Sequence, residues 1–87
     1  MEFEWDPAKR AANLAKHGLD FADAGEFDWL NAVIRVDDRR DYGEVRFLAW
    51  AQFRGRMHSV VFTRVGSAIR IISFRKSNKM EIRRYGH

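Results

Sequence analysis

The first eighteen residues pass from an alternating pattern to a helical one. Residues 1–5 alternate apolar and acidic side chains, which predicts a short strand with one buried face. Asp6 and Pro7 are typical of a helix start, because the carboxylate caps free N–H groups and proline has no N–H to satisfy. Gly18 is typical of a helix end. We therefore predict a strand followed directly by a helix that ends before Gly18.

A second short helix is expected immediately afterwards. Asp20 and Asp23 have the spacing of a helix-capping pair. Side chains three residues apart share one helix face. The buried side of this helix would therefore carry three apolar residues, Phe21, Ala24 and Phe27.

From residue 32 onward the apolar period changes to two, as it does in strands. A polar loop and two tight turns, at 54–56 and 66–67, divide this part into four expected strands: 32–36, 45–53, 57–64 and 69–75. Strands joined by such short turns pair as antiparallel neighbours. Asn78 and Glu81 have capping-box spacing, which predicts a last short helix.

The expected order of elements defines an α+β fold in a single domain, 1–87. An N-terminal strand and two helices precede a four-stranded antiparallel meander, and the short helix follows it. The helices would cover one face of the sheet, with Phe62 and Phe74 in the core, and leave the other face open. Strand alternation does not fix which side chains share a side, but six are expected on the open face: Arg46, Trp50, His58, Arg64, Arg70 and Arg75.

Charge adds to this picture because it is divided unevenly along the chain. Residues 1–53 carry seven basic and eleven acidic side chains, a net charge of −4. Residues 54–87 carry nine Arg or Lys and one acid, Glu81, a net charge of +8. Guanidinium groups bind phosphate oxygens through paired hydrogen bonds, and aromatic rings interleaved with them can stack on bases. The second half is therefore suited to bind RNA.

The composition excludes several other classes of protein. The chain has no cysteine, which excludes disulfides and thiolate metal sites, and its three histidines are not spaced as ligand pairs. No apolar stretch approaches the roughly 20 residues of a membrane span, and the N-terminus lacks the apolar run of a signal peptide. We expect a cytoplasmic protein without metal, cofactor or membrane association, and we interpret the acidic stretch around Asp37 as a solvated loop.

The chain contains side chains suited to metal-free cleavage of RNA. That reaction needs a base for the 2′-hydroxyl proton, cations for the charged phosphorane and an acid for the leaving 5′-oxygen. Glu44 and His17 are candidate proton acceptors, and His17 and Tyr85 are candidate donors. Three cations are candidate charge stabilisers, Arg64, Arg75 and Lys79. Structural roles are the alternative, with Glu44 as an ion-pair partner and His17 as a cation at a helix end.

A set of short motifs runs through nearly the whole chain. The first third contains WDP (5–7) and KHG (16–18), with Lys9, Asn13, Phe21 and Ala24. The second half contains GEVR (43–46) and RIISFRKS (70–77), with Lys79, Glu81 and Tyr85. Each motif alone is short, but the combination of WDP, KHG and RIISFRK is specific. Together they resemble the pattern of the BrnT toxin family.

The resemblance implies a RelE-like fold and a type II toxin, a metal-independent endoribonuclease that inhibits translation by cutting RNA. It also implies a BrnA-like antitoxin with a ribbon-helix-helix domain that binds operator DNA, in a complex of two toxins and two antitoxins. The catalytic positions would be His17, Glu44, Arg64, Arg75 and Lys79, where Arg64 is included because of its charge and its place beside a turn. The RNA-binding positions would be Arg46, Arg70, Lys76, Glu81 and Tyr85.

Two other functions are compatible with the same residues. Basic charge and aromatic rings explain affinity for nucleic acid without any turnover, so the chain could be a non-catalytic nucleic-acid-binding module. The basic open face could also be a dock for an acidic segment of a partner protein. Cleavage products ending in a 2′,3′-cyclic phosphate would distinguish the enzyme from both.

Overall fold

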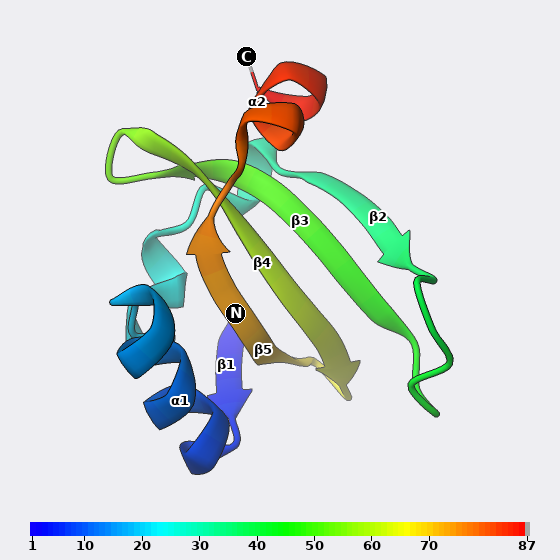
Figure 1. Ribbon diagram of the computed structural model, residues 1–87. Coiled ribbons are helices and arrows are strands. Elements are labelled where there is room, and N and C mark those ends of the chain that lie inside the picture. Colours follow the sequence, from blue (N-terminus) through cyan, green and yellow to red (C-terminus); the bar gives the residue numbers. More distant parts are fainter. Residues whose placement is uncertain (87) are drawn as a thin grey trace.

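Residues 1–86, which are the residues that the structure describes, form a twisted five-stranded sheet with helical segments against it (Figure 1). The structure is a computed structural model. In chain order its elements are β1 (Glu2–Trp5), α1 (Pro7–His17), η1 (Phe21–Glu26), η2 (Trp29–Asn31), β2 (Val33–Asp37), β3 (Arg46–Phe53), β4 (Arg56–Val65), β5 (Ala68–Lys76) and α2 (Lys79–Tyr85). The α+β class predicted from the sequence is confirmed.

The sheet is mixed, with the strand order β1-β5-β4-β3-β2. Strands β2 to β5 form the predicted antiparallel meander. The N-terminal strand β1 joins it as a fifth strand, parallel to β5, with Glu2 opposite Ala68 and Trp5 opposite Ile71. The prediction of a four-stranded antiparallel sheet was therefore wrong in this detail. Alternation in residues 1–5 identifies a strand, but it carries no information on a partner more than sixty residues away.

Helix α1 begins and ends where the sequence predicts. The Asp6 carboxylate accepts a hydrogen bond from the Ala8 N–H at 2.9 Å, and Gly18 adopts a left-handed conformation with φ 70°. Asn13, in the middle of the helix, donates to the Phe74 carbonyl at 2.9 Å and accepts from the Phe74 N–H at 3.1 Å. Strand β1 pairs with β5 only as far as Ile71, so Asn13 takes over the hydrogen bonds of the β5 edge beyond it. This clamp fixes the C-terminal end of α1 beside β5.

The second predicted helix is a 3₁₀ helix, η1, rather than an α-helix. The Asp20 carboxylate caps it by accepting from the Ala22 N–H at 2.9 Å. The expected buried side chains Phe21, Ala24 and Phe27 are all in the core. They recur every three residues, which is the period of a 3₁₀ helix. Over a segment of six residues this spacing does not distinguish a 3₁₀ helix from an α-helix, whose period is 3.6 residues.

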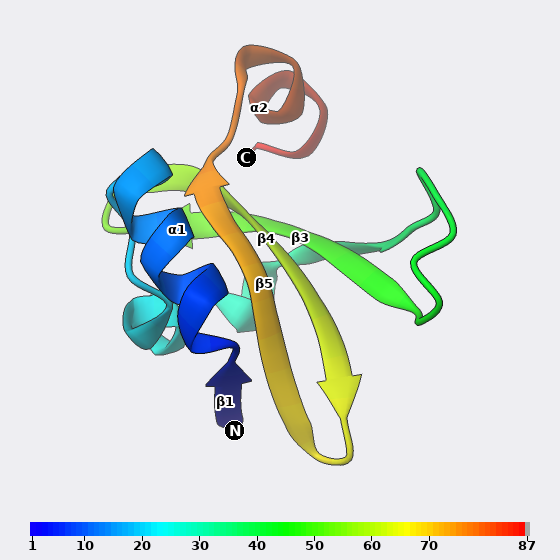
Figure 2. The same cartoon turned by 60° about the horizontal axis from the view of Figure 1, so that its bottom comes forward.

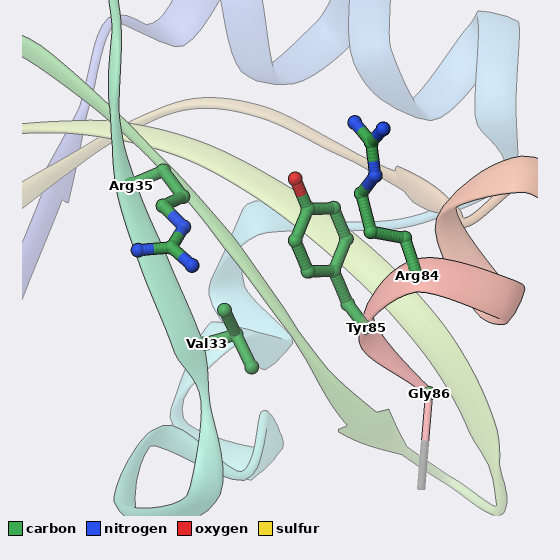
Figure 3. A pocket seen from close by; sticks show the side chains of 5 residues that line it. All are labelled: Val33, Arg35, Arg84, Tyr85 and Gly86. Atoms are coloured by element: carbon green, nitrogen blue, oxygen red, sulfur yellow. The ribbon is translucent and has the colours of Figure 1, made fainter.

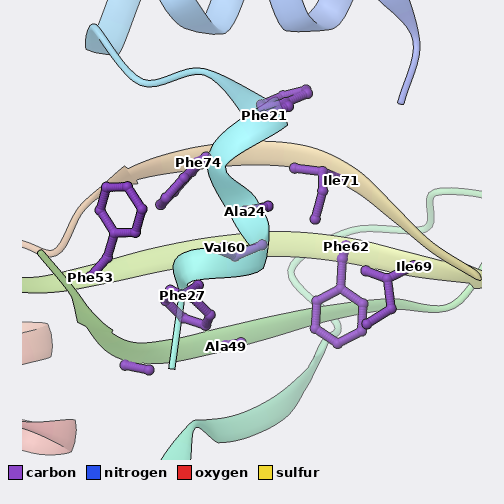
Figure 4. Close-up of a cluster of buried hydrophobic side chains, with 11 residues drawn as sticks. Phe21, Ala24, Phe27, Ala49, Phe53, Val60, Phe62, Ile69, Ile71 and Phe74 are labelled. Carbon is purple, nitrogen blue, oxygen red and sulfur yellow. The ribbon is translucent and has the colours of Figure 1, made fainter. Parts of the chain in front are cut away.

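The hydrophobic core lies between the sheet and the segments η1 and η2 (Figure 4). Register places alternate residues of β3, β4 and β5 on this side, among them Ala49 opposite Val60 and Val60 opposite Phe74. Phe62 and Phe74 are buried there, as the sequence predicts. The intervening residues, such as Leu48, point to the opposite, open face.

Four of the six side chains predicted on the open face lie there, and two do not. Trp50 and Arg75 share that face because both are opposite Ser59, and Arg46 and Arg70 belong to the same set of alternating positions. His58 is opposite Ala51, and Arg64 is opposite Ile69, so both point to the core side. The expectation for His58 and Arg64 was wrong because alternation gives the relative side of neighbours but not the absolute side.

Helix α2 extends past the end of β5, on the far side of that strand from α1 (Figure 2). The predicted capping box is present: the Glu81 N–H donates to the Asn78 side chain, and the Asn78 N–H donates to the Glu81 carboxylate, both at 2.9 Å. The ring of Tyr85 stacks on the ring of Trp50, with centroids 3.9 Å apart. Helix α2 therefore covers one end of the open face and leaves the centre of that face exposed.

Candidate active site

A hollow of about 280 Å³ lies on the open face, between the C-terminal end of α1 and strands β2 to β5. Its described lining contains four cations, one carboxylate and one histidine: Lys16, His17, Asp37, Arg39, Tyr42, Arg46, Val61, Ile72, Ser73 and Arg75. We call it the central hollow. His17, Arg46 and Arg75 were predicted as site residues, and the fold brings them together from three separate elements.

His17 is the last residue of α1, and the Asn13 clamp holds this end of the helix against β5. Burial, followed by the charges of Lys16 and Arg75, lowers the pKa of His17 below its ordinary 6.5. The imidazole is therefore mostly neutral at pH 7, not the helix-terminal cation that is its structural alternative. None of residues 1–86 forms a hydrogen bond with its ring. A neutral imidazole in a basic hollow is suited to accept a proton from a bound ligand.

Arg75 is held by Glu81, which is buried at the start of α2. The guanidinium donates to both carboxylate oxygens, at 2.7 and 3.0 Å. The same carboxylate accepts from Trp50 Nε1 at 2.6 Å, from Ser59 Oγ at 3.2 Å and from the Asn78 N–H at 2.9 Å. Burial by itself raises the pKa of Glu81, but the hydrogen bonds from Arg75, Trp50 and Asn78 outweigh it and lower the pKa to about 2. Glu81, predicted to bind RNA, is occupied in fixing Arg75 and α2 to the sheet.

The opposite wall of the central hollow is built by the segment that follows β2. Arg39 donates to both oxygens of the buried Asp37 carboxylate, at 2.7 and 2.8 Å, and the Tyr42 hydroxyl donates to the same group at 3.1 Å. The hydrogen bonds from Arg39, despite burial, lower the pKa of Asp37 to about 2. The Arg46 guanidinium lies over the Tyr42 ring at 4.2 Å. The interpretation of this stretch as a solvated loop therefore holds for residues 38–41, which are exposed, and is wrong for Asp37, which ends β2 and is buried.

Sequence reasoning missed Lys16, Arg39 and Tyr42 as site residues. Lys16 precedes His17 in the KHG motif, so this motif could have identified it as a site residue. Arg39 and Tyr42 belong to a stretch without any diagnostic motif. Their role depends on the buried Asp37 carboxylate, and burial of a single acid in a charged segment cannot be inferred from its neighbours.

Glu44 and Arg70 lie beside the central hollow rather than in it. Both line an adjoining hollow of about 260 Å³, which shares Arg46 with the central one. Glu44 is exposed and accepts from Arg46 Nε at 3.0 Å, which is the structural role weighed for it from the sequence. Arg70 is ion-paired with Glu4 at 3.3 Å. The two residues therefore border the site, with their charges partly compensated.

Tyr85 lines a third hollow, of about 210 Å³, under α2. Arg39 and Arg75 line both this hollow and the central one, so the two adjoin. Three further predicted cations line none of these three hollows: Arg64, Lys76 and Lys79. Arg64 and Lys76 are on the core side of the sheet, and Lys79 is exposed on α2. The fold does not bring these three to the other predicted site residues.

The central hollow can hold an anionic phosphate and take up a proton beside it. Its guanidinium groups are fixed by carboxylates and by an aromatic ring, so they are oriented before a ligand arrives. Within residues 1–86 no three His, Cys, Asp or Glu side chains are grouped as ligands of a metal ion. Among the described helices none is long and apolar enough to cross a membrane.

Comparison with known proteins agrees with this geometry. Residues 5–81 match the family model described as the ribonuclease toxin BrnT of type II toxin–antitoxin systems. The crystal structure of the Brucella abortus ribonuclease toxin BrnT is similar to this chain, with a TM-score of 0.69 and 38% sequence identity, over 91% of this chain and 99% of that one. A search among proteins with curated descriptions finds no match. On the family match and this likeness, the chain belongs to the BrnT family of ribonuclease toxins of type II toxin–antitoxin systems.

Proposed function

We propose that this toxin is an endoribonuclease that works without a metal ion, by transferring the scissile phosphodiester to the neighbouring 2′-hydroxyl. One observation carries the proposal: His17, whose pKa is lowered, lines the central hollow together with four cationic side chains. The whole chain, residues 1–87, acts as one toxin domain.

His17 is the proton acceptor in this proposal, and Glu44 is not. Transfer to the 2′-hydroxyl needs a base that is unprotonated at neutral pH and within reach of the bound phosphate. His17 lines the hollow with Arg46 and Arg75 and has a ring that no described residue engages. The Glu44 carboxylate is instead paired with Arg46 outside the central hollow.

Arg75 and Arg46 bind the scissile phosphate in this proposal, together with Lys16 and Arg39. Arg75 retains donors that its pairing with Glu81 does not use, because a guanidinium carries five N–H groups. Negative charge that develops on the phosphorane would be stabilised by these preoriented cations. The proton for the leaving 5′-oxygen comes either from His17 after it has accepted one, or from Tyr85 in the third hollow.

The physiological setting is also a proposal. Membership in a toxin–antitoxin family supports a cognate antitoxin that covers the open face and so blocks access of RNA. We propose that this antitoxin has a BrnA-like ribbon-helix-helix domain, that two toxins and two antitoxins assemble, and that the complex reaches operator DNA only through the antitoxin. The free toxin would cut RNA in the cytoplasm and inhibit translation.

Purified protein mixed with defined RNA in the presence of EDTA tests the activity directly. The expected result is cleavage with products that end in a 2′,3′-cyclic phosphate, which requires neither ribosomes nor a divalent metal. Retention of intact RNA that weakens with salt would instead establish the non-catalytic binding module. Cleavage that occurs only when a divalent ion is restored would contradict the metal-free mechanism.

A further inference from the structure

A hollow larger than the central one lies where α2 faces the edge strand β2 (Figure 3). Its volume is about 550 Å³, and its described lining consists of Val33, Arg35, Arg84, Tyr85 and Gly86. Figure 3 shows the Tyr85 ring standing between the side chains of Arg35 and Arg84. None of the residues predicted from the sequence as site residues, apart from Tyr85, belongs to it.

The Tyr85 ring is held in place by the Trp50 ring, on which it stacks. The two ring planes are 17° apart, and Trp50 is almost fully buried. The Trp50 ring is fixed in turn, because its N–H donates to Glu81 at 2.6 Å. A rigid aromatic ring beside open space is the arrangement on which single-stranded nucleic acids stack their bases, and it loses little side-chain entropy on binding.

The charge of this hollow selects an anion. Its described lining has two guanidinium groups and no carboxylate. Neither Arg35 nor Arg84 is ion-paired with a carboxylate of the described residues, whereas Arg46, Arg70 and Arg75 all are. Both side chains are exposed, so they can adjust to a phosphate.

The hollow adjoins the third hollow beneath α2, and the third hollow in turn adjoins the central one. Tyr85 and Arg84 also line the third hollow, which shares Arg39 and Arg75 with the central one. Arg35 reaches the same face from β2, since it is opposite Leu48, an open-face position. A chain that occupies the central hollow can therefore continue along this surface without leaving the protein.

We propose that Tyr85, Arg35 and Arg84 form a second nucleotide subsite, in which the ring stacks on a base of the RNA next to the cleavage position and the two guanidinium groups bind its phosphate. The inference rests on the proposed function and adds to it a position that extends the recognised RNA beyond the scissile phosphate. Aromatic stacking with phosphate contacts favours an RNA over a protein segment, which would need acidic or apolar complements.

Equilibrium binding separates this subsite from catalysis. The probe is a fluorescein-labelled oligonucleotide of about ten nucleotides with 2′-O-methyl riboses, which cannot be cleaved, followed by anisotropy over a salt series. The test variant is the double change Arg35→Gln with Arg84→Gln. The matched control is Arg56→Gln with Arg83→Gln, which also removes one charge from a strand and one from α2, at residues that line neither this hollow nor the three described above.

We expect the test variant to bind more weakly than the control and to have a shallower salt dependence, by about 0.7 in the log–log slope for each phosphate that is no longer neutralised. Tyr85→Ala should weaken binding about tenfold, and Tyr85→Phe should retain it because the ring is kept. Thermal unfolding checks that each variant is folded.

Each outcome of this experiment decides one of the two proposals. Equal affinity and slope in the test and control variants, or no binding by the native protein, would overturn the subsite and leave the surface to a partner such as the antitoxin. Normal cleavage of unmodified RNA alongside that result would leave the proposed function intact. Weakened binding in the test variant without any cleavage by the native protein would sink the proposed function and keep the subsite.

Discussion

Two histidines with lowered pKa lie on opposite sides of the sheet, and only one of them is suited to catalysis. His58 is 3% exposed, its Nδ1 is 2.8 Å from the Arg56 carbonyl oxygen, and its ring packs edge-on against Phe53 and Phe74. His17 lines the basic central hollow and has no hydrogen-bond partner among the described residues. Burial is the first cause of the lowered pKa in both.

The comparison teaches that a shifted pKa identifies a catalytic base only together with access to a ligand. In His58 the loss of solvation is a consequence of core packing, and no path leads from its ring to a phosphate. In His17 the cations Lys16 and Arg75 add to the effect of burial, and the same cations attract the anion on which the base would act. The sheet thus separates a histidine of the core from the histidine that we propose as the base.

The largest effect should follow from removing the base itself. We expect His17→Asn to lower kcat/KM for RNA by about 10²- to 10⁴-fold, the usual contribution of a general base. His58→Asn should lower thermal stability and leave the rate per folded molecule within a few-fold of the native value. Steady-state cleavage of a fluorogenic RNA measures both, with the folded fraction taken from circular dichroism.

The pH dependence of the native enzyme sharpens this comparison. Because His17 must be neutral to accept a proton, the rate should rise with pH and level off, with a midpoint below 6.5 where its lowered pKa lies. This rising limb should be absent in His17→Asn. An Asn variant as active as the native protein, or with the same pH profile, would remove His17 from the mechanism.

The next largest effect should distinguish two arginines on opposite faces of the sheet. Arg75→Ala removes a preoriented donor from the central hollow and should lower the cleavage rate about 10²- to 10³-fold, with loss of growth arrest on expression. Arg64→Ala removes the same charge from the core side and should reduce the rate far less. Equal losses in the two variants would show that general charge, and not placement, supports activity.

The smallest effect concerns the stability of the α2 attachment. Glu81→Gln should lower the free energy of unfolding at pH 7 by about 3 kcal/mol, because Arg75 loses its buried partner. The folded-state pKa of about 2 is below the ordinary 4.5, so this stabilisation is complete above pH 4.5 and is lost as pH falls towards 2. Urea unfolding at pH 7 and pH 3 measures it.

The outcome at the lower pH is the decisive one for Glu81. The difference between the native protein and Glu81→Gln should shrink at pH 3, because the Glu81 carboxyl of the unfolded chain, with its ordinary pKa of 4.5, is then mostly protonated while the folded state still holds the carboxylate. A difference that stays constant between pH 7 and pH 3 would mean that packing, rather than the ion pair with Arg75, attaches α2.

Much of the local structure was determined by the sequence alone. The caps of α1 at Asp6 and Gly18 and the capping box of α2 depend on side chains within a few residues of each backbone group, so they can be predicted from neighbours. The meander follows from apolar alternation with tight turns. The motifs KHG and RIISFRK indicated the family. The uneven charge and these motifs also pointed to His17, Arg46 and Arg75 as site residues.

Only the tertiary structure decided which of the predicted residues meet. Strand β1 pairs with β5 over a long sequence separation, and the absolute side of each strand depends on register, which is why Arg64 lies away from the site. Arg39 lines the central hollow because it pairs with the buried Asp37 carboxylate. Glu81, which the sequence analysis assigned to RNA binding, instead accepts hydrogen bonds from Arg75 and holds it in place. Local preferences act over a few bonds, whereas a site is assembled by packing between elements that are distant in the chain.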